Sequence, residues 1–220
     1  MMGRALEPAH NEKENGPMNS DSKLDPASDL QHLRRAIEDG LPPNPSASPE
    51  ASRLAVALNG DINQTAVAFN VFASLMASDG IRAALYSVLR KSDYRFISIF
   101  RFKDGKATSS VHVDRNDLNA RQAAEVADTA TYCCYVRNSD RPFATADATT
   151  DSRTADHPAR EVVRSYVGIP IFEPEGGFIG TLCHYDLVPR DPRQLDLELL
   201  LQVSSALARS GEVPPYPDVS

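Results

Sequence analysis

The chain has 220 residues, of which 41% are hydrophobic and 24% charged, and its 30 acidic and 23 basic residues give a net charge of -7. This composition excludes a wholly disordered or collagen-like chain, and the acidic balance argues against binding to nucleic acid or to an anionic membrane. No apolar run reaches the ~18–20 residues of a membrane-spanning helix, and residues 1–16 lack the apolar stretch of a secretory signal. Three cysteines, two of them adjacent, cannot build a disulfide framework, so we expect a reducing, cytoplasmic location.

The N-terminal part of the chain is poor in apolar side chains. Residues 1–24 and 41–50 are rich in Pro, Ser, Asn and Glu, and cannot bury enough surface to offset the entropy of ordering. Between them, a short amphipathic helix is predicted at 29–39 from an apolar stripe formed by Leu30, Leu33 and Ile37.

Three parts follow from this change in apolar content. We predict a mostly disordered segment at 1–60 that contains the short helix, a folded domain at 61–210, and a flexible tail at 211–220.

The domain begins with helical periodicity. The pattern becomes helical from Ala51, with broad apolar stripes over 67–76, and Ser78-Asp79-Gly80 interrupts or kinks it. Apolar residues then recur at helical spacing over 81–89.

Strand periodicity follows. Residues 95–103 and 106–114 flank Asp104-Gly105, a dipeptide typical of a two-residue hairpin turn. A short strand is predicted at 142–147 and a second hairpin at 165–173 and 177–186.

Two further helices are predicted. One covers 117–137. The other covers 192–209, with Asp191 as N-cap, Pro192 in the first position, Gln194 at capping-box spacing and Gly211 ending it.

This order of elements predicts an α+β fold with an antiparallel sheet of five to six strands. Helices from the two ends of the domain would pack on one face of the sheet. Connecting loops and the middle helices would cover the other face.

A set of short motifs lies in order along residues 141–190. They are a Gly-x-Pro segment at Gly168-Ile169-Pro170, a glycine-rich hairpin at Gly176-Gly177, a strand with Gly180-Thr181-Leu182-Cys183, and a turn with Asp186 and Pro189-Arg190. Together they resemble a GAF domain, over about residues 66–209. The resemblance implies a GAF/PAS-like sheet with a small-molecule pocket roofed by loops on one face, and a sensory or regulatory role more often than catalysis.

The ligand-binding residues that we predict come from the sheet and loops of this region: Phe143, Arg153, His157, Arg164, Tyr166 and Tyr185. Arg153 and Arg164 would anchor an anionic or carbonyl group through their forked donors, unless they are solvated loop residues. Asp147, Asp151, Asp156 and His157 fit no metal-site spacing and are interpreted as turn-forming carboxylates and a pocket histidine. We expect no metal and no cofactor.

The cysteines are interpreted as buried thiols. Cys133-Cys134 could pair only through a strained ring. Cys183 and His184 are neighbours in a predicted strand and would point to opposite faces, which disfavours bilin attachment there. One GAF branch reduces free methionine sulfoxide with cysteines in the loop before the Gly-x-Pro strand, where this sequence has none at 160–164.

The sequence therefore predicts a stand-alone sensory domain that binds an unknown small molecule and signals by self-association or through a separate output protein. The alternatives are a thiol-dependent reductase of the free methionine sulfoxide type and a dimerisation scaffold without a ligand. Excess apolar surface at 64–91 and 195–207 predicts a homodimer, unless the helix at 29–39 covers that surface within one chain. We expect no binding to nucleic acid or to a membrane.

Overall fold

The computed structural model of the chain describes residues 31, 34–35, 39 and 60–217. Four residues of the helix predicted at 29–39 are described, and all four are helical and exposed: Gln31, Arg34, Arg35 and Asp39. The rest of that helix, and the disordered segments predicted at 1–24 and 41–50, lie outside the described residues. From Gly211 to residue 217 the chain is irregular.

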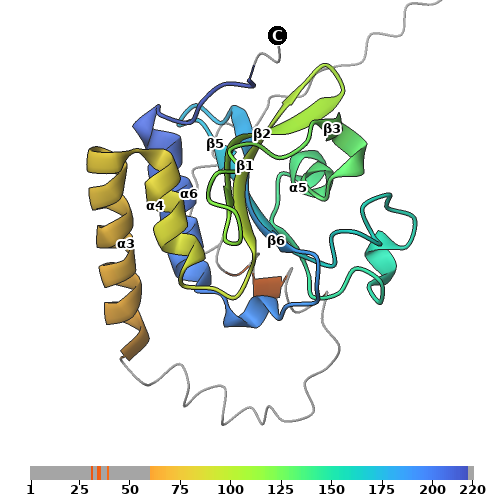
Figure 1. The fold of residues 1–220 in the computed structure, drawn as a ribbon, viewed down its shortest axis with the longest axis horizontal. Helices are drawn as coiled ribbons and strands as arrows, with labels where there is room; N and C mark the ends of the chain where they lie inside the picture. Colours follow the sequence, from red (N-terminus) through yellow and green to blue (C-terminus); the bar gives the residue numbers. More distant parts are fainter. Residues whose placement is uncertain (1–30, 32–33, 36–38, 40–59, 218–220) are drawn as a thin grey trace, which may run out of the picture.

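A six-stranded antiparallel sheet with the strand order β3-β2-β1-β6-β5-β4 forms the centre of the fold (Figure 1). Its strands are β1 (Phe96–Lys103), β2 (Lys106–Asp114), β3 (Val126–Ala127), β4 (Phe143–Thr145), β5 (Ser165–Phe172) and β6 (Phe178–Asp186). The β1–β2 turn takes positive φ at Asp104 (51°) and Gly105 (75°), which confirms the predicted two-residue hairpin.

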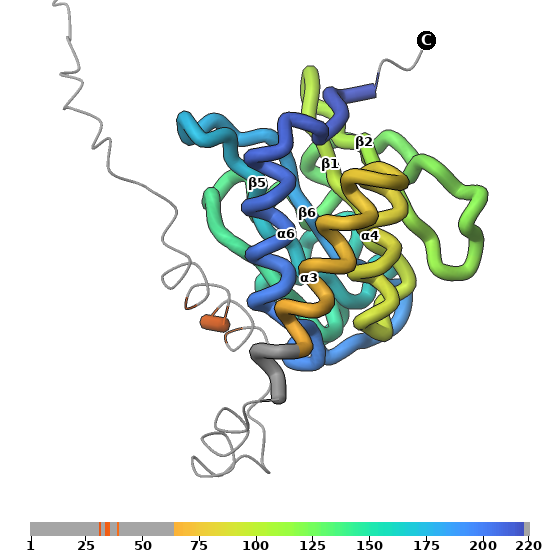
Figure 2. Tube along the Cα trace, turned by 90° about the vertical axis from the view of Figure 1, so that its left-hand side faces the viewer, coloured from red at the N-terminus to blue at the C-terminus, as the bar shows by residue number. Residues whose placement is uncertain are grey.

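Three helices cover one face of the sheet, namely α3 (Gly60–Asp79), α4 (Ile81–Leu89) and α6 (Leu197–Ser210). They lie side by side, with α4 and α6 on the strands and α3 packed outside them (Figures 1 and 2). The predicted break between the first two helices is confirmed at Gly80, whose φ is 83°. The prediction that helices from both ends of the domain share one face is therefore confirmed.

The other face carries loops, the 3-10 helices η1 (Asp128–Ala130) and η2 (Ser152–Thr154), and the short helix α5 (Cys133–Ser139) (Figure 1). Strand alternation sends aliphatic side chains to the helical face and a different set to the loop face. The aliphatic set, which forms the main core with α3, α4 and α6, includes Ile97, Ile99, Val111, Val113, Val167, Ile169 and Leu182.

The helix predicted at 117–137 is wrong, because only α5 and η1 are helical there. Tertiary hydrogen bonds occupy the backbone groups that a helix would need. The Arg82 guanidinium of α4 donates to the carbonyls of Leu118 (2.7 Å) and Ala120 (3.1 Å), and the Ala123 N–H donates to Ser109 Oγ (2.7 Å). The segment therefore runs back along β2 as a loop.

The start predicted for the last helix is also wrong. Asp191 caps a separate 3-10 helix, η3 (Pro192–Gln194), and α6 begins at Leu197 with Asp196 as its N-cap. The Asp196 carboxylate accepts from the Leu199 N–H at 2.9 Å. Two capping aspartates five positions apart each start their own element, and the buried Leu195 joins them. The predicted end at Gly211 is confirmed by its φ of 68°.

Candidate functional site

The strand register aligns five residues, one from each of five strands, in a row across the loop face. Direct pairing links, in order, Phe143, Gly168, Cys183, Ser98 and His112. The next row along the strands holds Thr145, Tyr166, Tyr185, Phe96 and Asp114. Because strand residues alternate between faces, this face is aromatic and polar where the helical face is aliphatic.

Position 168 needs a glycine because the side chain of Tyr166, two positions earlier, lies where a Cβ would be. A Cβ at Gly168 would lie 2.1 Å from the hydroxyl oxygen of Tyr166, so the Tyr166 ring occupies the space above the glycine. From there the hydroxyl donates to Cys133 Sγ at 3.2 Å. The glycine of the Gly-x-Pro motif thus allows a buried tyrosine to lie along the sheet and reach α5.

Aromatic rings from α5 and from the loop after β4 pack on this row. The ring centroids of Tyr132 and His157 are 4.4 Å apart, and those of Tyr135 and Phe143 are 4.6 Å apart. Tyr132 also meets Tyr166 edge-on at 5.6 Å. Such contacts give the loops a rigid base, because aromatic pairs add about 0.5–1.5 kcal/mol to simple area burial.

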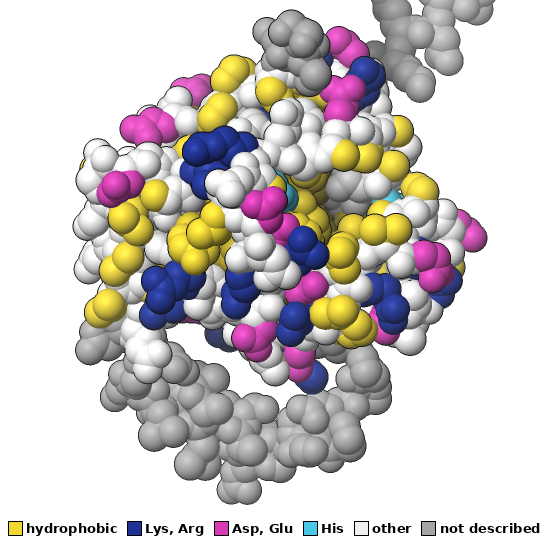
Figure 3. All heavy atoms as spheres, in the orientation of Figure 1, with side chains coloured by type: hydrophobic (Ala, Val, Ile, Leu, Met, Phe, Trp, Pro, Cys, Tyr) yellow, Lys and Arg dark blue, Asp and Glu magenta, His cyan; other side chains and the backbone are white. Residues whose placement is uncertain are grey.

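An open pocket of about 410 Å³, called the cavity below, lies above this cluster between η1, α5 and the loop at 152–158, and most of its lining residues are exposed. Its lining is mixed in chemistry: Thr129, Tyr135, Ser152, Arg153, Ala155, Asp156, His157 and Pro158. The space-filling view shows the loop side of the molecule hollowed, with hydrophobic and histidine side chains visible in the hollow (Figure 3). A volume of this size is within the range of small-molecule sites.

The Arg153 guanidinium is held by a fork, meaning two hydrogen bonds to both carboxylate oxygens of the aspartate two positions earlier. The same local arrangement occurs a second time, at Arg193. The Arg153 Nε lies 3.0 Å from Asp151 Oδ1 and its Nη2 lies 2.7 Å from Asp151 Oδ2, while Asp151 also caps η2. Arg193 makes the same fork with Asp191, at 2.9 and 2.8 Å, where Asp191 caps η3. The Asp-x-Arg turn is therefore a local structural device, and Arg193 is a natural control for Arg153.

Two further contacts distinguish Arg153 from Arg193. Its Nη2 donates to the Ala144 carbonyl of β4 at 2.6 Å, and its guanidinium lies 4.7 Å from the centre of the Phe143 ring. These contacts attach the loop to the sheet edge and place a cation on the wall of the cavity.

His157 supplies the most buried polar group of the lining. Its Nδ1 accepts from the Ala159 N–H at 3.1 Å, so in the neutral ring the proton is on Nε2, which lies 3.8 Å from Cys134 Sγ. Burial lowers the pKa of His157 from its ordinary value. At neutral pH the imidazole is therefore an uncharged donor.

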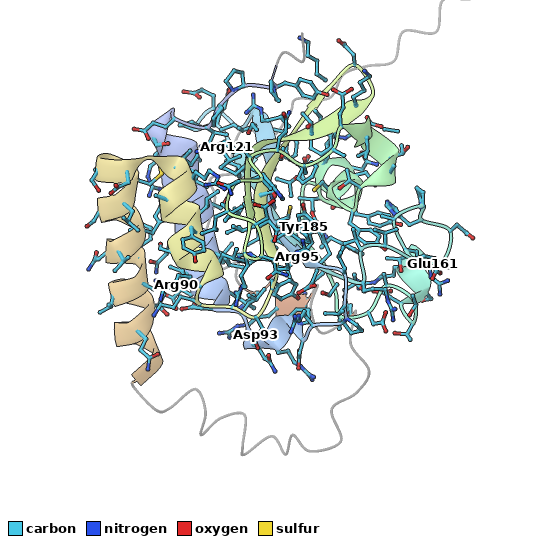
Figure 4. All side chains as sticks on the ribbon, viewed as in Figure 1. Arg90, Asp93, Arg95, Arg121, Glu161 and Tyr185 are labelled. Carbon is cyan, nitrogen blue, oxygen red and sulfur yellow. The ribbon has the colours of Figure 1, made fainter. Side chains whose placement is uncertain are left out.

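Four predicted site residues lie outside the cavity lining, and one of them, Phe143, lies directly under Arg153. Arg164 forms a bidentate pair with Asp147, at 2.9 Å for both contacts, and this pair lowers the pKa of Asp147 to about 2. Tyr166 lies beneath the cavity, buried on Gly168. Tyr185 stacks on Phe96 with centroids 4.6 Å apart, at the centre of the sheet face (Figure 4).

The other two predicted residues, Arg153 and His157, line the cavity. The sequence reasoning missed Thr129, Tyr135 and Ser152, and it interpreted Asp156 as a turn-forming carboxylate first and a contact to a pocket ligand second. Tyr135 lies in the segment predicted as one long helix at 117–137, and that prediction does not place it at a pocket. The available signal for the others was the irregular polar stretch at 148–164 within the family motifs.

The acidic residues of this loop behave largely as predicted. Asp147 Oδ1 accepts from the Thr149 N–H at 3.1 Å and Asp151 Oδ1 accepts from the Arg153 N–H at 3.0 Å, which confirms both as turn-forming carboxylates. Within the part of the chain that the structure describes, no three His, Cys, Asp or Glu side chains gather as a metal site would need.

The predicted split between Cys183 and His184 is confirmed. Cys183 belongs to the aromatic cluster on the loop face, whereas His184 meets Tyr94 edge-on with centroids 5.8 Å apart. Burial lowers the pKa of His184 to about 3, and neither ring nitrogen has a hydrogen-bond partner among the described residues. His184 is thus a neutral core residue.

The family model of the GAF domain matches residues 77–210. The chain therefore belongs to the GAF domain family. A comparison with curated proteins finds no match. None of the described helices has the length and apolar character needed to cross a membrane.

Solved structures with this fold share little sequence with the chain. The GAF domain of an Acinetobacter phosphoenolpyruvate-protein phosphotransferase has 11% identity and a TM-score of 0.51, over 66% of this chain and 90% of that one. The structure of fRMsr of Staphylococcus aureus in complex with its substrate has 14% identity and a TM-score of 0.50, over 66% of this chain and 93% of that one. A GAF sensor protein from Burkholderia vietnamiensis has 14% identity and a TM-score of 0.47, over 68% and 91%. At these identities the likeness is one of fold.

Proposed function

We propose that this chain is a cytoplasmic sensory GAF domain that binds a small organic molecule in the cavity between α5 and the loop at 152–158. The cavity of about 410 Å³ with Arg153, His157 and Tyr135 on its wall carries the proposal. It combines a cation, a neutral donor and an aromatic ring on a rigid base, which is the arrangement of a recognition site.

The lining also favours one class of ligand. The Arg153 charge is already paired with Asp151, and Asp156 adds a carboxylate beside it, so the wall offers no unpaired positive charge to a strong anion. The Tyr135 ring, the His157 imidazole and the Arg153 guanidinium suit a planar, uncharged or zwitterionic molecule with a carbonyl or ring acceptor.

Arg153→Ala should weaken binding of such a molecule about 10-fold or more, because it removes a charged donor worth about 1.5–3 kcal/mol and frees the loop from β4. The ligand is first identified by native mass spectrometry of protein purified from its own host. Its affinity is then measured by calorimetry for the wild type, Arg153→Ala and Arg193→Ala. Arg193→Ala removes the same fork outside the cavity and should leave the affinity unchanged. Equal affinities for all three proteins would count against this site.

The cysteines argue against the reductase alternative. Reduction of a sulfoxide needs a thiolate beside the substrate, and no sulfur atom lines the cavity. Cys133 and Cys183 are fully buried. Burial raises the pKa of Cys134, which lies behind His157.

The output of the proposed sensor is self-association through α3. From residue 62 to 78 this helix has no charged residue, although its outer side is exposed, with Val67 at 55% and Val71 at 46%. The leucines of α6 are largely buried within the chain, between the sheet and α3. An exposed, uncharged stripe on a long helix favours pairing with a second copy about a two-fold axis.

Val67→Glu should therefore convert a dimer into a monomer, since two carboxylates would be buried near the axis. Sedimentation velocity at tens of micromolar measures the change. Val162→Glu, at an equally exposed valine in the loop before β5 (63%), is the matched control and should remain dimeric. A wild type that sediments as a monomer would contradict the α3 interface.

A further inference from the structure

Two cysteines that are 50 positions apart meet beneath α5. Cys133 is the first residue of α5 and Cys183 lies on the loop face of β6, and their sulfur atoms are 4.0 Å apart. Both side chains are fully buried, and both are free thiols. Nothing in the proposed ligand site uses either sulfur.

We propose that Cys133 and Cys183 are a redox site, in which oxidation by a peroxide joins them in a disulfide that ties α5 to the sheet. A disulfide needs sulfur atoms about 2.05 Å apart, so the reduced pair is in contact but not yet bonded. Rotation of the two side chains with a small displacement of α5 closes the gap.

The third cysteine does not compete for this bond. Cys134 Sγ points to the His157 side of α5, 3.8 Å from Nε2. A bond between Cys133 and Cys134 would need the strained ring of adjacent cysteines. The structure therefore selects one pair among the three possible pairs.

The surroundings distinguish the roles of the two sulfurs. Burial opposes ionisation of Cys133, but hydrogen bonds with Cys183, Thr131 and Tyr166 outweigh it and lower the pKa of this thiol. Burial, followed by the neighbouring Cys133, raises the pKa of Cys183. The Tyr166 hydroxyl donates to Cys133 Sγ at 3.2 Å and would stabilise a thiolate there, which makes Cys133 the attacking sulfur.

The reaction balances with a peroxide as the only co-reactant. The Cys133 thiolate attacks a peroxide oxygen and breaks the O–O bond, which leaves a sulfenic acid on Cys133 and releases water or an alcohol. The Cys183 sulfur then attacks the Cys133 sulfur, so that the S–S bond forms, the S–O bond breaks and water leaves. Two thiols lose two electrons to the peroxide, and their two protons end on its two oxygen atoms. The oxidant reaches the buried pair when α5 opens locally.

The disulfide would alter the ligand cavity. Tyr135 of α5 lines the cavity and Tyr132 packs under His157, so a shift of α5 toward β6 moves the cavity wall. This consequence rests on the proposed function, whereas formation of the disulfide does not.

The test uses the full chain, reduced and then treated with hydrogen peroxide. Free thiols are alkylated, and the protein is digested and mapped by mass spectrometry without reduction. We expect one intramolecular link between Cys133 and Cys183, a loss of about 2 Da that dithiothreitol reverses. Cys134→Ala should keep this link, and Cys133→Ala and Cys183→Ala should abolish it.

Several outcomes would overturn the proposal: no intramolecular link in the wild type, a link through Cys134, or cross-links only between chains. The mapped link in the wild type and in Cys134→Ala decides the matter even if a core cysteine variant fails to fold. A ligand screen that finds nothing, while the link forms, would remove the proposed ligand and leave the redox site standing. Ligand binding without formation of the link would support the proposed ligand site and overturn the redox site.

Discussion

Replacing Asp186 by alanine is expected to destabilise the domain by about 3 kcal/mol. The Asp186 carboxylate is buried at the end of β6 and accepts from three donors: the N–H groups of Arg95 (3.0 Å) and Leu187 (2.7 Å) and the Arg190 Nε (2.8 Å). Removing it leaves these donors without an acceptor at the point where β1, β6 and the following turn meet. Urea denaturation measures the loss.

Asp191→Ala is the matched control for this experiment. Asp191 also pairs with an arginine, at 2.8 Å, but this pair is more exposed and Asp191 caps only a three-residue helix. Its removal should cost about 1 kcal/mol or less. Equal losses for the two variants would show that Asp186 is only a surface ion-pair partner.

Gly180→Ala is expected to destabilise the domain by about 3 kcal/mol, because the added methyl has no space. Its Cβ would lie 2.3 Å from the Phe100 carbonyl oxygen, a backbone atom of the paired strand β1. For a domain of this size such a loss lowers the melting temperature by roughly 6–12 °C. Thermal unfolding followed by circular dichroism measures the shift.

Gly177→Ala tests whether the effect comes from the close backbone approach. There the added Cβ would meet only the end of the Glu173 side chain, at 2.8 Å, which can rotate away. We expect a change within about 0.5 kcal/mol. A Gly177 variant as unstable as the Gly180 variant would contradict the steric explanation.

The sequence was sufficient to predict the parts of the fold that depend on local chemistry. The Asp104-Gly105 turn, the glycine after the first two helices and the alternation of Cys183 and His184 each follow from a residue's own conformational or facial preference. The family motifs marked Gly168, Gly180 and Asp186, but only the structure shows why each is needed: a tyrosine above it, a carbonyl beside it and three donors around it.

The candidate site was harder to predict, because loops create it. Long-range hydrogen bonds with Arg82 and Ser109 keep residues 117–125 out of a helix. These bonds leave no periodic signal in the sequence. Nothing in the sequence distinguishes Arg164 from Arg153. In the structure, Arg164 pairs with Asp147 at the base of the loop. Arg153 is held at the cavity by Asp151 and by the Ala144 carbonyl. Such differences follow from tertiary placement.

The most direct test of the proposed site is to map, by NMR, the amide shifts that the host-derived ligand causes in the full chain. The account predicts that the largest amide shifts fall on residues that line the cavity, namely Thr129, Tyr135, Ser152, Arg153, Ala155, Asp156 and His157. Arg193, in the duplicate turn, should not shift. Largest shifts along α3, or around Phe96 and Tyr185 with none at 152–158, would place the ligand elsewhere and contradict the assignment.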